Sequence, residues 1–115
     1  MNYGDIVLIA HYATEMRHLK IRPALIISSK EYNTRETDRI LLPVSSNITR
    51  ASPDDILIID KETAFKATGL KVSSAIRAGK IFTSDISLIK RKIGQLRDKK
   101  LNKVRERIKK TLDLK

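Results

Sequence analysis

The residues best suited to chemistry in this 115-residue chain stand at the ends of two apolar runs. Arg22 directly precedes the run 23–28, and Ser45 directly follows the run 39–44. If both runs are strands that pair antiparallel, the start of one lies beside the end of the other, so Arg22 and Ser45 meet at one sheet edge. A cation beside a hydroxyl can bind a phosphodiester and orient it. An exposed arginine and a turn-forming serine remain the alternative interpretation.

Other polar side chains near the ends of predicted strands extend this candidate site. They are Ser28, Ser46, Asn47, Ser73, Ser74 and Arg77, joined by His18 and Lys20 from the segment that precedes Arg22. The set suits cleavage of RNA without a metal, because RNA carries its own 2′-OH nucleophile and the protein need only polarise the phosphate and move protons. His18 titrates near neutral pH, which makes it a candidate base or RNA contact, with a solvated loop histidine as the alternative.

The composition argues against several other classes of site. The chain has no Cys, which excludes disulfides, thiolate chemistry and Cys-based metal sites, and its two His residues argue against zinc. It has no glycine-rich phosphate loop, so no cofactor is expected. No segment is long enough to span a membrane, and the run 6–10 is too short for a signal peptide. A cytoplasmic protein without a membrane partner is therefore predicted.

The positive charge is concentrated at the C-terminal end. The chain carries 24 Lys and Arg against 13 Asp and Glu, a net charge of +11. Residues 88–115 hold 12 of these bases and 3 of these acids, so 12 − 3 leaves +9 in that segment. Such a patch attracts a polyanion, either nucleic acid or an acidic protein segment. A solvated basic helix face is the alternative.

Apolar runs predict six or seven short strands within one domain. They cover residues 5–10, 23–28, 39–44, 55–59, 71–77, 79–82 and 90–96. Residues 11–21 are expected to form a loop, 29–38 a connector or short helical turn, and 61–68 a helical turn closed by Gly69. Short strands with irregular turns predict a small, strongly bent barrel or sandwich.

Two helices are predicted towards the C-terminus. The segment 83–85 can cap a short helix over 86–89. Asp98 is expected to cap a longer helix that ends at Leu112. Its apolar stripe is Leu101, Val104, Ile108 and Leu112, and its opposite face is basic.

Segments along nearly the whole chain resemble the MazF/PemK family of type II toxins. The matching pieces are 4–7 (GDIV), 22–28 (RPALIIS), 42–47 (LPVSSN), 69–71 (GLK) with Ser73, Ser74 and Arg77, 80–83 (KIFT) with Asp85 and Ile89, and 93–96 (IGQL). Each piece is weak alone, but their order and spacing are together specific.

The resemblance implies a mainly β (α+β) fold in a single domain, residues 1–115. It implies an SH3-like β-barrel over about 3–97 with a C-terminal helix over about 98–113, usually as a two-fold homodimer. The implied activity is a metal-independent endoribonuclease that cuts single-stranded RNA and leaves a 2′,3′-cyclic phosphate and a 5′-hydroxyl. The implied partner is a cognate antitoxin, which binds DNA in the toxin–antitoxin complex and covers the RNA groove with a disordered acidic tail.

The resemblance also implies roles for individual residues. Arg22 matches the arginine that binds and polarises the scissile phosphate, and Ser45 stands where many members have a threonine that contacts it. Ser46 and Asn47 would line the groove and help to read bases. Where several members carry an arginine or a carboxylate after Gly69-Leu70, this chain has Val72, Ser73 and Ser74.

That departure leaves alternatives open. Without the carboxylate, either Arg22 and Ser45 suffice or the protein is a weak or inactive relative. Arg77 is a candidate for the second charge, with a structural or dimer-contact role as the alternative. The other functional hypotheses are a non-catalytic RNA-binding barrel that uses the basic helix, and a CcdB-like toxin that targets a protein.

Overall fold

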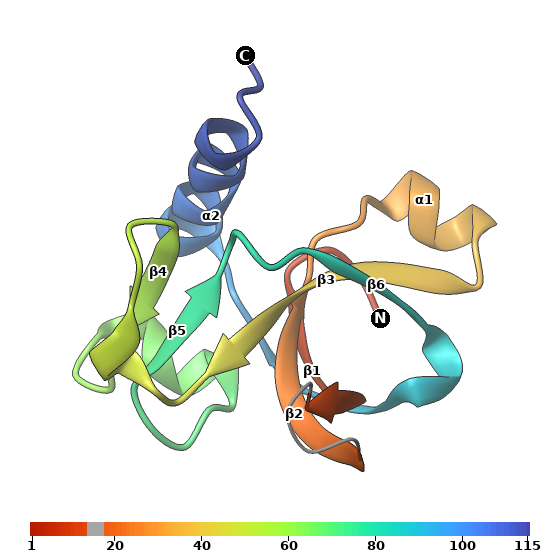
Figure 1. The fold of residues 1–115 in the computed structure, drawn as a ribbon, viewed down its shortest axis with the longest axis horizontal. Helices are drawn as coiled ribbons and strands as arrows, with labels where there is room; N and C mark the ends of the chain where they lie inside the picture. The colour runs from red at the N-terminus through yellow and green to blue at the C-terminus, as the bar shows by residue number, and fades with distance from the viewer. Residues whose placement is uncertain (14–17) are drawn as a thin grey trace.

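The apolar runs form a seven-stranded antiparallel sheet that curls around the main core (Figure 1). The computed structural model describes residues 1–13 and 18–115, with the side chains of residues 1–10 and 20–115. The strands are β1 (Asp5–Ala13), β2 (His18–Ile26), β3 (Asp38–Ser45), β4 (Asp55–Ile58), β5 (Ser74–Arg77), β6 (Phe82–Asp85) and β7 (Ile89–Gln95). The helices are α1 (Lys30–Arg35) and α2 (Asp98–Thr111), with 3-10 helices η1 (Ile48–Arg50), η2 (Thr63–Thr68) and η3 (Ile86–Leu88).

The sheet is a partly open barrel. Its strand order is β4-β5-β3-β2-β1-β7, and β6 pairs with the first half of β3. Within the described residues no pairing joins β4 to β7, and η2 packs against β7 at this seam instead. The predicted mainly β fold with a C-terminal helix is therefore confirmed, and the barrel is not closed.

Strand alternation explains the core. Ile6, Leu25 and Leu42 point to one side of the sheet, where they join the cluster that holds Leu96 and Val104 of the C-terminal region. The intervening residues point to the other side and form a second cluster, namely Val7, Ile9, Ala24, Ile26 and Leu41. Both faces are covered where residues 6–10 of β1 and residues 24–26 of β2 lie, and the sequence is apolar in continuous runs there. Further along β2, Ile21 and Arg22 are exposed.

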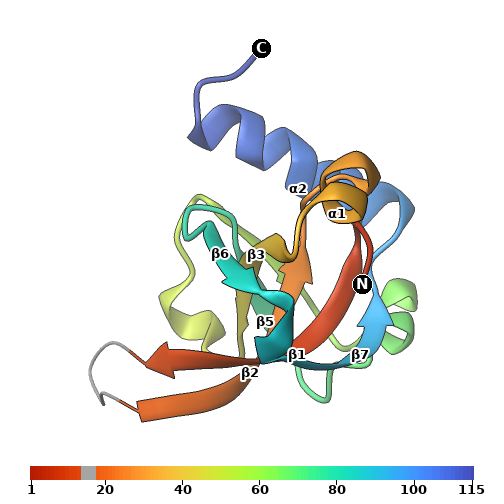
Figure 2. The same cartoon turned by 90° about the vertical axis from the view of Figure 1, so that its right-hand side faces the viewer.

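Both helices lie at one end of the molecule. In Figures 1 and 2, α1 and α2 stand at the top, and the β1–β2 hairpin reaches toward the bottom. Lys100 of α2 donates to the Leu57 carbonyl at 2.8 Å and pairs with Glu62 at 3.0 Å, and Thr111 donates to Asp54 at 2.8 Å. Part of the basic face of α2 therefore fixes the helix on the sheet. No helix formed by the described residues is long and apolar enough to cross a membrane.

Several predicted boundaries were wrong. The expected loop 11–21 is largely strand, because Ala10↔Ile21 through Ala13↔His18 continue the β1–β2 ladder; residues 14–17 lie outside the described part of the chain. The predicted strand 71–77 begins only at Ser74, and the strand predicted over 79–82 forms at 82–85, where it pairs with β3.

The helix caps divide into confirmed and wrong predictions. Asp85 accepts a hydrogen bond from the Ser87 N–H at 2.9 Å and caps η3 as predicted. Gly69 ends η2, also as predicted, with a φ of 73° that favours glycine. Asp98 does not cap α2: Arg97 occupies the N-cap position without a side-chain bond, and Asp98 is the first helical residue.

Candidate active site

A pocket of about 340 Å³ opens between β1, β2, β7 and the segment after η2. Its lining combines apolar side chains of the main core, such as Val44 and Leu70, with hydroxyls and cations. The lining residues are Leu8, Arg22, Pro23, Val44, Ser46, Gly69, Leu70, Lys71, Val72, Ser74, Arg91 and Ile93. The pocket is therefore the open end of the core, bordered by hydroxyls and cations.

Two glycines bring the pocket walls together. A Cβ on Gly69 would lie 2.0 Å from the Ile93 carbonyl oxygen, and a Cβ on Gly94 would lie 2.3 Å from the Thr68 carbonyl carbon. Only glycine permits two backbones to approach this closely. The contact lays the end of η2 directly on β7 and brings Lys71 to the same pocket as Arg91.

The pocket carries three cationic side chains, Arg22, Lys71 and Arg91. All three are exposed, and no acidic residue lines the pocket among the described residues. The described part of the chain also gives none of them an ion pair. Unpaired cations around a concave, partly apolar surface concentrate a positive potential there, which suits an anionic ligand.

The predicted pairing of the strands behind Arg22 and Ser45 is confirmed. β2 and β3 pair antiparallel from Ile26↔Leu41 to Ala24↔Pro43, and two further steps in this register place Arg22 opposite Ser45. The ladder stops at Ala24↔Pro43, and the next residues of β3, Val44 and Ser45, pair with β5 on the other edge of the strand. The pocket opens where the two strands separate.

The Ser45–Asn47 segment forms a tight turn beside the pocket. The Ser45 hydroxyl oxygen accepts the Asn47 N–H at 3.1 Å, which leaves its hydrogen free to donate. Ser46 lines the pocket, whereas Ser45 does not. The Asn47 side-chain oxygen accepts from Thr49 at 2.7 Å.

The other predicted contacts divide between pocket, scaffold and strand face. Ser74 lines the pocket, but it is only 3% exposed and its hydroxyl donates to the Val72 carbonyl at 2.9 Å. Ser73 accepts the Asp60 N–H at 2.8 Å, outside the pocket lining. Lys20 shares a face of β2 with Arg22, because strand side chains alternate. His18 has its backbone in β2, and its side chain lies outside the described residues.

Two candidate residues have side chains that are already bonded within the fold. Arg77 forms an ion pair with Asp55 and donates to the Asn47 carbonyl at 2.9 Å, so it holds the turn after β3 and does not enter the pocket. Ser28 is buried, with its hydroxyl donating to Asn33 at 2.5 Å.

The sequence interpretation missed two pocket cations, Lys71 and Arg91. Both arginines lie beside the same stretch of β1, because β7 pairs along one edge of that strand and β2 along the other. Arg91 is opposite Leu8, and Arg22 is opposite Ile9. For Arg91, the available signal was the run of three basic residues at 90–92 inside a predicted strand. Local periodicity assigns such a run to an exposed face of the strand.

The family model of the PemK-like, MazF-like toxins of type II toxin–antitoxin systems matches residues 2–112. The chain belongs to this family. A search of curated proteins finds no significant match to the sequence.

Solved structures show the same PemK/MazF-type fold. An endoribonuclease in complex with its cognate antitoxin, from a mycobacterial species, aligns with a TM-score of 0.79 at 16% identity, over 100% of this chain and 97% of that one. MazF in a MazE–MazF structure from Deinococcus radiodurans aligns at 0.76 and 20% identity, over 100% and 97%. The toxin MazF-mt6 from Mycobacterium tuberculosis aligns at 0.73 and 18% identity, over 95% and 98%. The similarity at these identities is one of fold.

Proposed function

We propose that this toxin is a metal-independent endoribonuclease that cleaves single-stranded RNA at the pocket between β2 and β7. The observation that supports this proposal most is that Arg22, Lys71 and Arg91 all line one concave surface. No carboxylate lines this surface among the described residues. Family membership supports the toxin role, and the unpaired cations support a phosphodiester as the group that is bound.

In this proposal the RNA 2′-oxygen attacks the adjacent phosphorus and the bond from phosphorus to the 5′-oxygen breaks. Water takes the proton of the 2′-hydroxyl and gives one to the leaving 5′-oxygen, so the products are a 2′,3′-cyclic phosphate and a 5′-hydroxyl. Arg22 and Arg91 stabilise the negative charge that develops on the phosphoryl oxygens. Ser45 precedes the pocket-lining Ser46, and the free hydrogen of its hydroxyl donates to a phosphoryl oxygen of RNA that extends past the mouth of the pocket.

The flanking residues are proposed to position the RNA strand. Lys20, on the Arg22 face of β2, contacts a neighbouring phosphate, and His18 further along β2 contacts the RNA. Ser46 and Asn47 meet bases at the mouth of the pocket, and Arg77 acts indirectly by fixing the Asn47 backbone. Ser73 and Ser74 contribute through the backbone contacts that shape the wall.

The same positive surface supports regulation by a cognate antitoxin. An acidic, disordered tail that occupies the pocket would compete with RNA for the same cations. A two-fold homodimer would present two such pockets. Both statements rest on the toxin family and on the charge of the pocket.

The test is cleavage of a long mixed-sequence RNA in EDTA by wild type, Arg22→Ala and Ser45→Ala, followed by mapping of the ends. Discrete cuts with cyclic-phosphate and 5′-hydroxyl ends, lost in Arg22→Ala and weakened in Ser45→Ala, support the proposal. Binding without cuts would assign an RNA-binding barrel, and neither binding nor cuts by the folded wild type would point to a protein target.

A further inference from the structure

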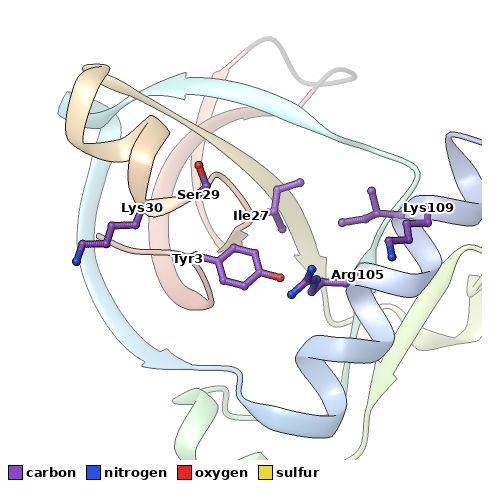
Figure 3. A pocket seen from close by; sticks show the side chains of 7 residues that line it. Tyr3, Ile27, Ser29, Lys30, Arg105 and Lys109 are labelled. Carbon is purple, nitrogen blue, oxygen red and sulfur yellow. The ribbon is translucent and has the colours of Figure 1, made fainter. Parts of the chain in front are cut away.

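A second groove, of about 530 Å³, lies between the two helices (Figure 3). Both helices are at the opposite end of the molecule from the hairpin (Figure 2). Its walls come from the N-terminal turn, the segment from β2 into α1, and one face of α2. The lining residues are Tyr3, Ile27, Ser29, Lys30, Arg105, Ile108 and Lys109. None of them lines the candidate active site. We call this surface the helix groove.

The floor of the helix groove is apolar. Ile27 and Ile108 are partly buried against the main core, and the Tyr3 ring lies beside Ile27 with its hydroxyl pointing toward Arg105 (Figure 3). Burial raises the pKa of the Tyr3 phenol above its ordinary 10.0, against the opposing charge of Arg105, so the phenol is neutral at physiological pH. The Ser29 hydroxyl already accepts the Tyr32 N–H at 3.1 Å. An apolar side chain would thus find a hydrophobic floor.

The rim of the helix groove is cationic. Lys30 comes from α1, and Arg105 and Lys109 come from successive turns of α2. Lys109 has an exposed ion pair with Glu106 at 3.6 Å, whereas Lys30 and Arg105 have no ion pair within the described residues. No acidic residue among those described lines the groove. Three cations around an apolar floor complement an acidic segment that carries an apolar anchor.

We propose that the helix groove docks an acidic segment of a partner protein, with an apolar side chain between Tyr3, Ile27 and Ile108 and carboxylates on Lys30 and Arg105. Charge complementarity favours this occupant over a second copy of the chain, because a two-fold contact through this patch would bring the same cations together. Tyr3 is the one aromatic ring among the described lining residues. A floor with one ring favours an apolar side chain over RNA, whose successive bases stack on several aromatic rings. The proposal does not depend on ribonuclease activity.

The probe is a fluorescein-labelled synthetic peptide of alternating Asp and Glu with two central Leu residues, measured by anisotropy on the full chain. Arg105→Glu is expected to weaken binding about tenfold or more, because it reverses a rim charge. Lys103→Glu is the matched control, since it makes the same charge change on an exposed residue of α2 outside the groove, and it should weaken binding less than about threefold. A peptide with Ser in place of both Leu should lose binding to a similar extent as the Arg105→Glu protein.

Other outcomes would overturn the proposal. Equal losses for Arg105→Glu and Lys103→Glu would mean general attraction to the basic helix. Loss on Arg91→Glu but not on Arg105→Glu would place the peptide in the active-site pocket. A change of oligomeric state in Arg105→Glu by light scattering would make the groove a contact between copies. Absence of peptide binding by the folded wild type would also reject it.

Discussion

Arg22 and Arg77 lie on β2 and β5, the strands on the two sides of β3 in the same curved sheet, and their side chains differ in whether they have partners. Arg22 is exposed at a pocket that has no lining carboxylate among the described residues. Arg77 is 17% exposed at its side chain, paired with an Asp55 side chain that is 3% exposed, and bonded to the Asn47 carbonyl. A cation with its donors already used holds the fold together, whereas an unpaired cation in a concave surface is available to a ligand.

The largest expected effect is on cleavage by Arg22→Ala. Removing a group that stabilises transition-state charge should lower the single-turnover rate by about 10²–10³. The free energy of unfolding should change by less than about 0.5 kcal/mol, since an exposed side chain without an ion pair is removed. Urea unfolding and a cleavage assay on the same variant check both numbers. A large loss of stability would mean that Arg22, like Arg77, holds the fold together.

Arg77→Ala should show the reverse pattern. It leaves Asp55 buried without its counter-ion and frees the Asn47 carbonyl, so the free energy of unfolding should fall by about 3 kcal/mol. Cleavage measured well below the unfolding transition should fall less than in Arg22→Ala.

A double-mutant cycle separates the ion pair from general damage. Asp55→Ala and Arg77→Ala together should cost less than the sum of the single changes, because neither buried charge is then left alone. Strict additivity would show that the two residues contribute independently and that Arg77 is not held by Asp55.

Gly94→Ala tests the backbone contact that shapes the pocket. A Cβ there would lie 2.3 Å from the Thr68 carbonyl carbon, so the free energy of unfolding should fall by about 1–3 kcal/mol. Cleavage should fall as well, because Lys71 and Arg91 would be moved apart. Gly79→Ala is the control: its Cβ would meet nothing closer than 3.7 Å, and stability should change by less than about 0.5 kcal/mol.

The smallest effect is expected at Asp85, an exposed acid used only as a cap. Hydrogen bonds from the Ser87 hydroxyl and N–H hold the pKa of this carboxyl below its ordinary 3.8. Its ionised form therefore stabilises the fold fully above pH 3.8, and that contribution disappears as the pH falls through the lower folded value. The difference in urea midpoint between wild type and Asp85→Asn should be small at pH 6 and should disappear as the pH falls below 3.8. A difference that persists in acid would assign the effect to cap geometry.

Local sequence patterns were enough to predict the parts of the site that depend on neighbouring residues. The apolar runs that follow Arg22 and precede Ser45 predicted their strands, and the polar turn after Ser45 predicted where β3 ends. Asp85 and Gly69 were identified as a cap and a helix end because both signals lie within one turn of chain. These features follow from spacing alone.

Features that depend on distant pairing were not predictable in this way. Arg91 reaches the pocket because β7 pairs with β1, more than 80 residues earlier in the chain. Arg77 is withdrawn from the pocket because the β4–β5 register places it opposite Asp55. Residues 11–13 and 18–21 were assigned to a loop because the segment mixes polar and apolar side chains, although hairpin pairing extends through them.

The most direct test of the account is the rate of cleavage by Arg91→Ala at an RNA site that the wild type cuts in EDTA. Arg35→Ala is the matched control, because it removes an exposed arginine from α1, away from the pocket. The account predicts a loss of about 10²–10³ for Arg91→Ala at unchanged stability, and no more than about a twofold change for Arg35→Ala. Equal rates for the two folded variants would contradict the assignment of the pocket as the site where RNA is cut.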